Sequence, residues 1–292
     1  MDVQKYIKEY VVPDAADFRL ISESTNKVYS FVSGGKKYIL KFSTMNLNNL
    51  SPFWEQLRMV YQSDFVTQAN TSAFLTLHLL KNPYIYLPEV VHADTRDQII
   101  QIIEYINGKS YKPDIFPSSV CYQLGRYVGW FHSATFEGYG KYSENMNLND
   151  CGTYIESCKN SMRSCIEKYW SQNHDVTAFF GKMESNMIET PSSFVLMMPD
   201  ISANQFVYSD DLSEIIGLVD FDAYVVGRRE LELAVVELCL SDHAAFIRGY
   251  EEHQAMPSIQ STRDFYRFMI YLNDPWDPMD FGRYISEKHY FQ

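Results

Sequence analysis

Several familiar sequence features are missing, and each absence narrows the class of protein. No apolar run approaches the ~20 residues that a membrane helix needs, and the N-terminal stretch MDVQKYIKEYVV lacks the apolar core of a secretory signal. The chain also lacks the motifs G-x-x-x-x-G-K-[ST], G-x-G-x-x-G, H-E-x-x-H and G-x-S-x-G. The sequence therefore predicts a cytoplasmic protein without a membrane segment, and it excludes the common signatures of phosphate-loop, dinucleotide-binding, zinc-protease and serine-hydrolase sites.

Cysteine is scarce, and its spacing does not indicate a metal site. The chain has five cysteines, and no paired Cys or His spacing accompanies them. Cys151, Cys158 and Cys165 recur at intervals of seven residues, which places them along one face of a helix. We interpret them as small buried residues of a protein in a reducing compartment.

Positive charge is also in short supply. The chain has 25 Lys and Arg against 37 Asp and Glu, which gives a formal net charge of -12. This balance disfavours nucleic acid as a partner, because a nucleic-acid backbone is held mainly by Lys and Arg. A cationic small molecule fits the charge better, and a solvated acidic surface is the simpler explanation.

What the chain does contain is enough apolar sequence for a large packed core. It has 292 residues, of which 46% are hydrophobic and 15% aromatic. This length exceeds that of a typical single domain, so we expect either one large domain or two lobes around a cleft.

The first third of the chain reads mostly as strands. The stretches DFRLIS, KVYSFV and KKYILKF have strand patterns, and Ser33-Gly34-Gly35 predicts a hairpin turn between the last two. EVVHA and QIIQIIEYI are two more strand candidates, and one helix is expected from Phe65 to Leu80. These elements predict a small antiparallel sheet with one helix packed on it.

Beyond Gly108 the pattern becomes helical. Val120, Leu124, Val128 and Phe131 fall on one helical face, and ELELAVVELCL shows a similar periodicity further along. A lone histidine on such an apolar helix, His132, is interpreted as structural. Between the helices, residues 196–224 read as a hairpin with an Asp before its first strand and another after its second.

The order of three charged residues suggests a chemistry. Lys41 comes late in a strand, Asp200 precedes the hairpin and Asp220 follows it. Phosphoryl transfer from a nucleotide needs a Lys on the phosphates, a carboxylate that orients the acceptor hydroxyl and a carboxylate that holds Mg²⁺. An alternative is that both aspartates only cap turns, which explains each residue alone but not the ordered set.

With these residues in place, the chain resembles the aminoglycoside phosphotransferase and choline kinase-like enzymes, distant relatives of protein kinases. The motifs that carry the resemblance are SESTNKVYSF, the strand Lys in YILKF, the connector EYINGKSY, the L-G-x-x-x-x-x-x-H pattern ending at His132, LVDFDAY and VGRRELELA. The resemblance implies an α+β, two-lobed protein kinase-like fold. It implies a nucleotide-binding sheet lobe over residues 1–106 and a catalytic, substrate-binding helical lobe over residues 107–292.

The same resemblance implies site residues. The expected nucleotide-binding residues are Ser24, Asn26, Lys41, Glu104 and Ile106. The backbone of the connector is expected to contact the adenine. The expected catalytic residue is Asp200. The expected Mg²⁺ ligands are Asp220 and Gln205, or Asp220 and Asn204 if the loop is shifted. Asp222 and Glu230 are the expected substrate-binding acids.

The motif around Asp200 departs from the family pattern H-G-D-x-x-x-x-N. Met198 stands where His is usual, Pro199 where Gly is usual, and Gln205 where the metal-binding Asn is usual. Gln205 keeps an amide oxygen on a longer side chain, so Gln205→Asn is expected to raise turnover if this residue binds the metal. No acid lies near residues 70–72, where the partner of the phosphate-binding Lys belongs in this fold.

Two functions therefore stay open from the sequence. The first is a phosphotransferase that moves the γ-phosphate of ATP or GTP, with Mg²⁺, to a hydroxyl of a small molecule, an aminoglycoside antibiotic among the candidates. The second is a catalytically inactive pseudokinase that binds a nucleotide or a protein partner. We favour the enzyme because Lys41, Asp200 and Asp220 are all retained.

Overall fold

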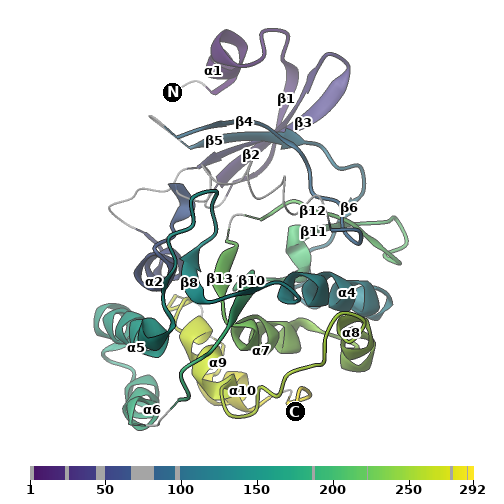
Figure 1. Ribbon diagram of the computed structural model, residues 1–292. Coiled ribbons are helices and arrows are strands. Elements are labelled where there is room, and N and C mark those ends of the chain that lie inside the picture. Colours follow the sequence, from purple (N-terminus) through teal and green to yellow (C-terminus); the bar gives the residue numbers. More distant parts are fainter. Residues whose placement is uncertain are drawn as a thin grey trace.

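The computed structural model describes most of the chain. The described residues are 3–23, 26–43, 50–66, 82–95, 99–185, 188–221, 223–276, 279–287 and 289–292. The predicted α+β, two-lobed architecture is confirmed: a five-stranded sheet forms one part of the molecule and most of the helices form the other (Figure 1). None of the described helices is long and apolar enough to cross a membrane.

The N-terminal sheet is antiparallel throughout and contains the predicted strands. Its order is β1-β2-β3-β5-β4, with bounds β1 (Ala16–Glu23), β2 (Asn26–Ser33), β3 (Lys36–Ser43), β4 (Val90–Asp94) and β5 (Ile100–Glu104). The β2–β3 hairpin turns at Gly34 and Gly35, whose φ values of 54° and 75° lie in the left-handed region that glycine adopts without strain. The predicted turn is therefore confirmed.

The register of this sheet gathers polar residues near the ends of β2, β3 and β5. Asn26 pairs with Ser43 across β2 and β3, and Lys41 pairs with Gln101 across β3 and β5. Directly opposed residues have side chains on the same face of a sheet. Lys41 and Gln101 are thus neighbours on one face.

Helix α1 (Val3–Tyr10) covers the other face of the sheet and was not indicated by the sequence pattern. Its Ile7 is fully buried in a small core with Phe31, Leu40, Ile100 and Ile102. This core is separate from the larger one in the helical lobe.

The helical lobe is built around a second small sheet with the order β7-β10-β13-β8-β9. Its strands are β7 (Thr135–Phe136), β8 (Gly138–Lys141), β9 (Asn149–Asp150), β10 (Phe194–Met197) and β13 (Val225–Gly227). The α-helices are α4 (Cys121–His132), α5 (Tyr154–Cys165), α6 (His174–Glu184), α7 (Arg229–Cys239), α8 (His243–Tyr250), α9 (Arg263–Tyr271) and α10 (Phe281–Ser286). Short 3₁₀ or π turns lie at η1 (Ser118–Val120), η2 (Cys151–Thr153), η3 (Ile166–Trp170) and η4 (Ala203–Gln205).

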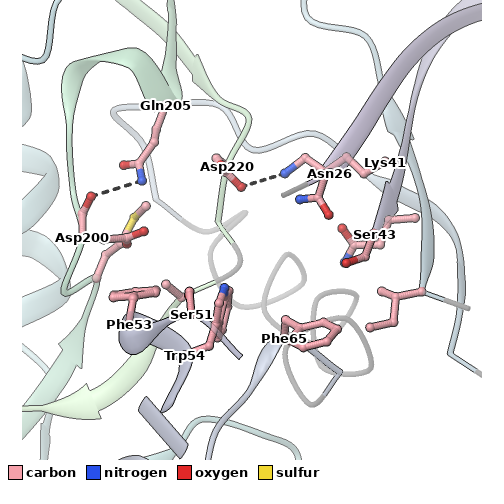
Figure 2. A pocket seen from close by; sticks show the side chains of 14 residues that line it. Asn26, Lys41, Ser43, Ser51, Phe53, Trp54, Phe65, Asp200, Gln205 and Asp220 are labelled. Atoms are coloured by element: carbon pink, nitrogen blue, oxygen red, sulfur yellow. Dashed lines mark hydrogen bonds and ion pairs between the residues drawn. The ribbon is translucent and has the colours of Figure 1, made fainter. Parts of the chain in front are cut away.

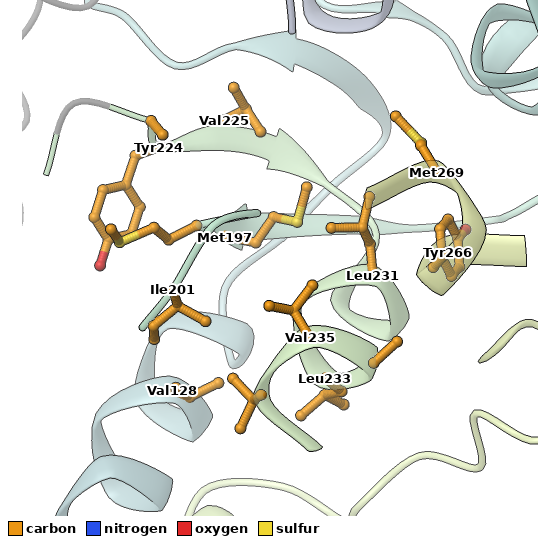
Figure 3. Packing of buried hydrophobic residues seen from close by; sticks show 14 of the residues in the cluster. Val128, Met197, Ile201, Tyr224, Val225, Leu231, Leu233, Val235, Tyr266 and Met269 are labelled. Carbon is orange, nitrogen blue, oxygen red and sulfur yellow. The ribbon is translucent and has the colours of Figure 1, made fainter. Parts of the chain in front are cut away.

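The core of this lobe fills the space between the second sheet and its helices. Figure 3 shows Met197 and Val225 of the sheet packed against Leu231 and Val235 of α7. Helices α4 and α8 approach so closely that a Cβ atom at Gly125 would lie 2.1 Å from the Phe246 carbonyl oxygen. Only glycine permits this approach at that position.

The burial expected of the cysteines is confirmed for Cys158 and Cys165 but not for Cys151, and the structural role expected of His132 is confirmed. Cys158 and Cys165 are buried in α5, Cys151 is partly buried at η2, and all three are free thiols. His132 is fully buried, with Nε2 2.6 Å from a Glu232 carboxylate oxygen and Nδ1 2.9 Å from the Tyr250 hydroxyl. It is a satisfied structural residue.

One helix from the first 106 residues packs against the helical lobe. Helix α2 (Pro52–Tyr61) begins after Ser51 with a proline in its first turn, and it packs against α5, β8 and β13 of the helical lobe (Figure 1). The division of the chain at residue 106 stays a prediction. The helix predicted from Phe65 to Leu80 falls almost wholly outside the described residues.

Candidate active site

A hairpin brings the two predicted aspartates to one end of a third sheet. Strands β11 (Phe206–Tyr208) and β12 (Ile215–Leu218) pair antiparallel, and β6 (Lys109–Ser110) flanks β11. The Val219 N–H donates to the Gln205 carbonyl oxygen at 3.0 Å, which ties the chain beside Asp220 to the loop that carries Asp200. The hairpin thus positions both carboxylates together.

Internal contacts hold the loop from Met198 to Gln205. Ile201 and Ala203 are fully buried anchors. The Gln205 amide makes two bonds within the loop: Oε1 accepts from the Ser202 N–H at 2.9 Å, and Nε2 donates to the Asp200 carbonyl oxygen at 3.1 Å. The Tyr208 hydroxyl donates to the Ala203 carbonyl oxygen at 2.7 Å. The backbone at Asp200 is therefore fixed from several sides.

An ion pair joins the two lobes. Lys41 Nζ of β3 lies 2.8 Å from Asp220 Oδ1, although the residues are 179 positions apart in sequence. The Lys41 side chain is 10% exposed and that of Asp220 is 49% exposed. The buried ammonium is compensated by a carboxylate that still faces solvent.

These residues line a cavity of about 290 Å³. In Figure 2, Asp200 and Gln205 lie on one side, Lys41, Asn26 and Ser43 on the other, and Asp220 between them. The full lining is Asn26, Lys41, Ser43, Ser51, Phe53, Trp54, Phe65, Ile99, Gln101, Met198, Asp200, Gln205, Asp220 and Ala223. The structure thus brings together five residues that the sequence predicted: Asn26, Lys41, Asp200, Gln205 and Asp220.

The start of α2 and Phe65 form an aromatic wall of this cavity. The Phe53 and Trp54 rings are 5.3 Å apart between centroids, and Trp54 and Phe65 are 6.0 Å apart. Figure 2 shows Phe53 and Ser51 close to Asp200. Sequence reasoning did not identify this wall; a Ser-Pro pair before an apolar stretch is the helix-start signal that predicts α2, but nothing in it indicates the cleft.

The two candidate amide ligands for a metal are placed differently. Gln205 lines the cavity. The Asn204 side chain does not; its Nδ2 donates to Asp114 Oδ1 at 2.8 Å and its Oδ1 accepts from the Ser202 hydroxyl at 2.7 Å. In this structure Asn204 belongs to the outer surface of the loop.

The cavity fits Mg²⁺ held jointly with a phosphate chain. Among the described residues, no group of three or more His, Cys, Asp or Glu side chains is placed to hold a metal ion. Mg²⁺ bound to a nucleotide needs only one or two carboxylates, since phosphates and waters fill the other positions. The half-exposed Asp220 carboxylate, beside the buried Lys41 ammonium, matches that requirement.

The predicted adenine connector follows β5 and lies outside the lining of this cavity. Glu104 Oε2 accepts a hydrogen bond from the Tyr86 hydroxyl, which raises the pKa of Tyr86 to about 12. Ile106 packs against β12, because a Cβ atom at Gly217 would lie 2.3 Å from Ile106 Cδ1. The connector is therefore seated on the hairpin that carries the aspartates.

The remaining predicted site residues are not brought into this cavity. Ser24 and Asp222 lie outside the described residues, and their roles stay predictions. Glu230 is buried, pairs with Arg228 at 2.6 Å and lines a different cavity with Thr190 and Ser258. Its predicted substrate role has no support from its position.

Comparison with solved structures identifies the fold. The macrolide 2'-phosphotransferase of Brachybacterium faecium superposes with a TM-score of 0.60 at 11% identity, over 94% of this chain and 90% of that chain. A putative aminoglycoside phosphotransferase of Ralstonia eutropha gives 0.62 at 10% identity, over 94% and 85%. A spectinomycin phosphotransferase gives 0.58 at 13% identity, over 93% and 84%.

The chain has the two-lobed, protein kinase-like fold of these phosphotransferases. No protein-family model matches the sequence, and no curated protein matches it. At identities of 10–13% the comparison shows the fold alone, so the function has to be argued from the residues of the site.

The two hydrogen bonds that the Gln205 side-chain amide makes within the loop give a prediction about its role. If Gln205 mainly braces the loop, Gln205→Asn shortens the amide, breaks at least one of its two loop bonds and lowers the free energy of unfolding by about 1 kcal/mol without raising turnover. Chemical denaturation and initial rates measure the two effects. Asn204→Ala, on the outer side of the loop, is the control for general loop damage. A stable Gln205→Asn variant with higher turnover would instead assign Gln205 to the metal.

Proposed function

We propose that this protein is a kinase of small molecules, which transfers the γ-phosphate of ATP or GTP to a hydroxyl group. The observation that carries the proposal is the 2.8 Å ion pair between Lys41 and Asp220 in the cavity that Asp200 also lines. Reaction by this route needs few protein groups, because position and charge stabilise most of the transition state.

Each of the three residues has a role that its surroundings support. Lys41, released from Asp220, binds the phosphate chain with an ammonium that is already desolvated. Asp200, on a braced loop, orients the acceptor hydroxyl and takes its proton. Asp220 holds the Mg²⁺, with Gln205 as a second candidate, and the ion when bound neutralises charge on the phosphates.

The neighbours and the cavity wall support a small hydroxylated acceptor. The spectinomycin phosphotransferase structure contains ADP and spectinomycin, and another neighbour is a macrolide 2'-phosphotransferase. In the present protein the aromatic wall near Asp200 suits an acceptor with an apolar ring face. An aminoglycoside with several positive charges would need acids beyond Asp200 and Asp220, and Asp222 is the candidate next to them in sequence.

The alternative is a pseudokinase that binds a nucleotide or a protein partner without turnover. Its specific support is Gln205, whose amide is engaged within the loop, together with Met198 and Pro199 at the two motif positions before Asp200.

The test is a pair of measurements on the full chain. Binding of ATP and of GTP is measured by calorimetry with excess Mg²⁺ and with EDTA, and a panel of hydroxylated antibiotics, sugars and amino alcohols is then screened for ADP or GDP release. We expect Mg²⁺-dependent binding and release with at least one acceptor. Binding without any release favours the pseudokinase. No nucleotide binding overturns the kinase and the nucleotide-binding form of the pseudokinase.

A further inference from the structure

Gln101 is a buried polar residue at the candidate active site that the fold itself does not explain. It lies on β5 directly opposite Lys41 and is 3% exposed. Its side chain lines the same cavity as Lys41, Asp200 and Asp220.

The amide nitrogen of Gln101 has no hydrogen-bond partner among the residues that the structure describes. Leaving a buried donor unpaired destabilises the folded state, so native proteins rarely retain one without a reason. Gln123 shows the ordinary case in this chain: its Nε2 donates to the carbonyl oxygens of Tyr84 and Ile215, each at 2.7 Å, and its Oε1 accepts from the Ile215 N–H at 2.8 Å. Gln123 is a structural glutamine, whereas the described part of the chain offers no acceptor to the Gln101 donor.

We propose that Gln101 is a ligand-binding residue, whose Nε2 donates a hydrogen bond to a phosphate oxygen of the bound nucleotide beside Lys41. The inference rests on the proposed function. Lys41 pairs with Asp220 at 2.8 Å, and a phosphate chain that draws Lys41 away from Asp220 enters next to the Gln101 amide. The phosphate chain then supplies the acceptor that the described residues do not.

The test is Gln101→Met, which keeps the length of the side chain and removes the donor. We expect the dissociation constant for the triphosphate that the wild type binds, and for its diphosphate, to rise about tenfold, in line with a hydrogen bond to a charged group. Affinity for the parent nucleoside should stay unchanged. The melting temperature should stay equal or rise, because replacing an unpaired buried donor with an apolar group removes a cost.

Ile102→Met is the matched control. It introduces the same side chain at the next position of β5, where Ile102 is buried in the core on the opposite face of the sheet. We expect it to alter stability without separating nucleotide from nucleoside affinity.

The outcomes separate the inference from the proposed function. Unchanged triphosphate affinity in Gln101→Met, or an equal loss for nucleotide and nucleoside, overturns the role of Gln101 and leaves the kinase proposal standing. A lower melting temperature with no change specific to phosphates would make Gln101 a structural residue. A wild type that binds no nucleotide overturns both proposals.

Discussion

Asp200→Asn is expected to lower the rate of phosphoryl transfer by about a hundredfold or more while nucleotide affinity stays near that of the wild type. The side chain lines the cavity on a loop that buried anchors and the Gln205 amide hold in place. The substitution keeps its shape and removes only the base. A positioned general base contributes about a hundredfold to ten-thousandfold to rate. Rates of product formation with the best acceptor, and calorimetry with nucleotide and Mg²⁺, measure the two quantities.

Asp114→Asn is the control for this experiment. Asp114 is an exposed carboxylate that binds the same loop from its outer side, through the Asn204 amide at 2.8 Å. It should leave the transfer rate near that of the wild type. Equal, low background rates in wild type, Asp200→Asn and Asp114→Asn, with nucleotide still bound, would reject the kinase and leave the pseudokinase.

The strands of the first sheet could be predicted because their signals are local. KVYSFV and KKYILKF alternate around two consecutive glycines, and the hairpin forms between them as the φ values of Gly34 and Gly35 require. The packing of α2 could not be predicted, because its contacts with α5 and β8 come from the other lobe. A helix start signal says where a helix begins but not which core it joins.

The charged residues of the site could be predicted from their order in the sequence. The contacts that hold them in place could not. Lys41 and Asp220 are 179 positions apart in sequence, and only the folded chain shows that they pair directly. The two bonds of the Gln205 amide are likewise a property of the loop conformation. From the sequence alone Gln205 reads as a lengthened metal ligand, and from the structure it also reads as a brace for Asp200.

The pairing of Lys41 with Asp220 also bears on the missing acid near residues 70–72. That segment lies outside the described residues, so the helix partner expected from the family stays untested. The ion pair nevertheless gives the buried ammonium a carboxylate in the cleft. Under the proposed function, nucleotide binding would exchange these partners: Lys41 would hold the phosphates and Asp220 would hold the Mg²⁺.

This exchange makes Asp220→Ala the most informative substitution for the metal site. The variant should lose the Mg²⁺ dependence of nucleotide binding, so that affinities with excess Mg²⁺ and with EDTA become equal, and transfer should fall by about a hundredfold or more because the metal contributes several kcal/mol to charge stabilisation. Because Asp220 is half-exposed, the fold should survive its removal. Calorimetry under both conditions and circular dichroism measure these effects.

Asp210→Ala is the matched control for Asp220→Ala, since it removes an exposed carboxylate from the turn of the same hairpin. It should keep the full Mg²⁺ dependence. A folded Asp220→Ala variant that still binds nucleotide more tightly with Mg²⁺ than with EDTA would place the metal elsewhere, and Lys41 would then pair with Asp220 for structural reasons alone. Loss of nucleotide binding under both conditions would show instead that Asp220 mainly holds Lys41 in position.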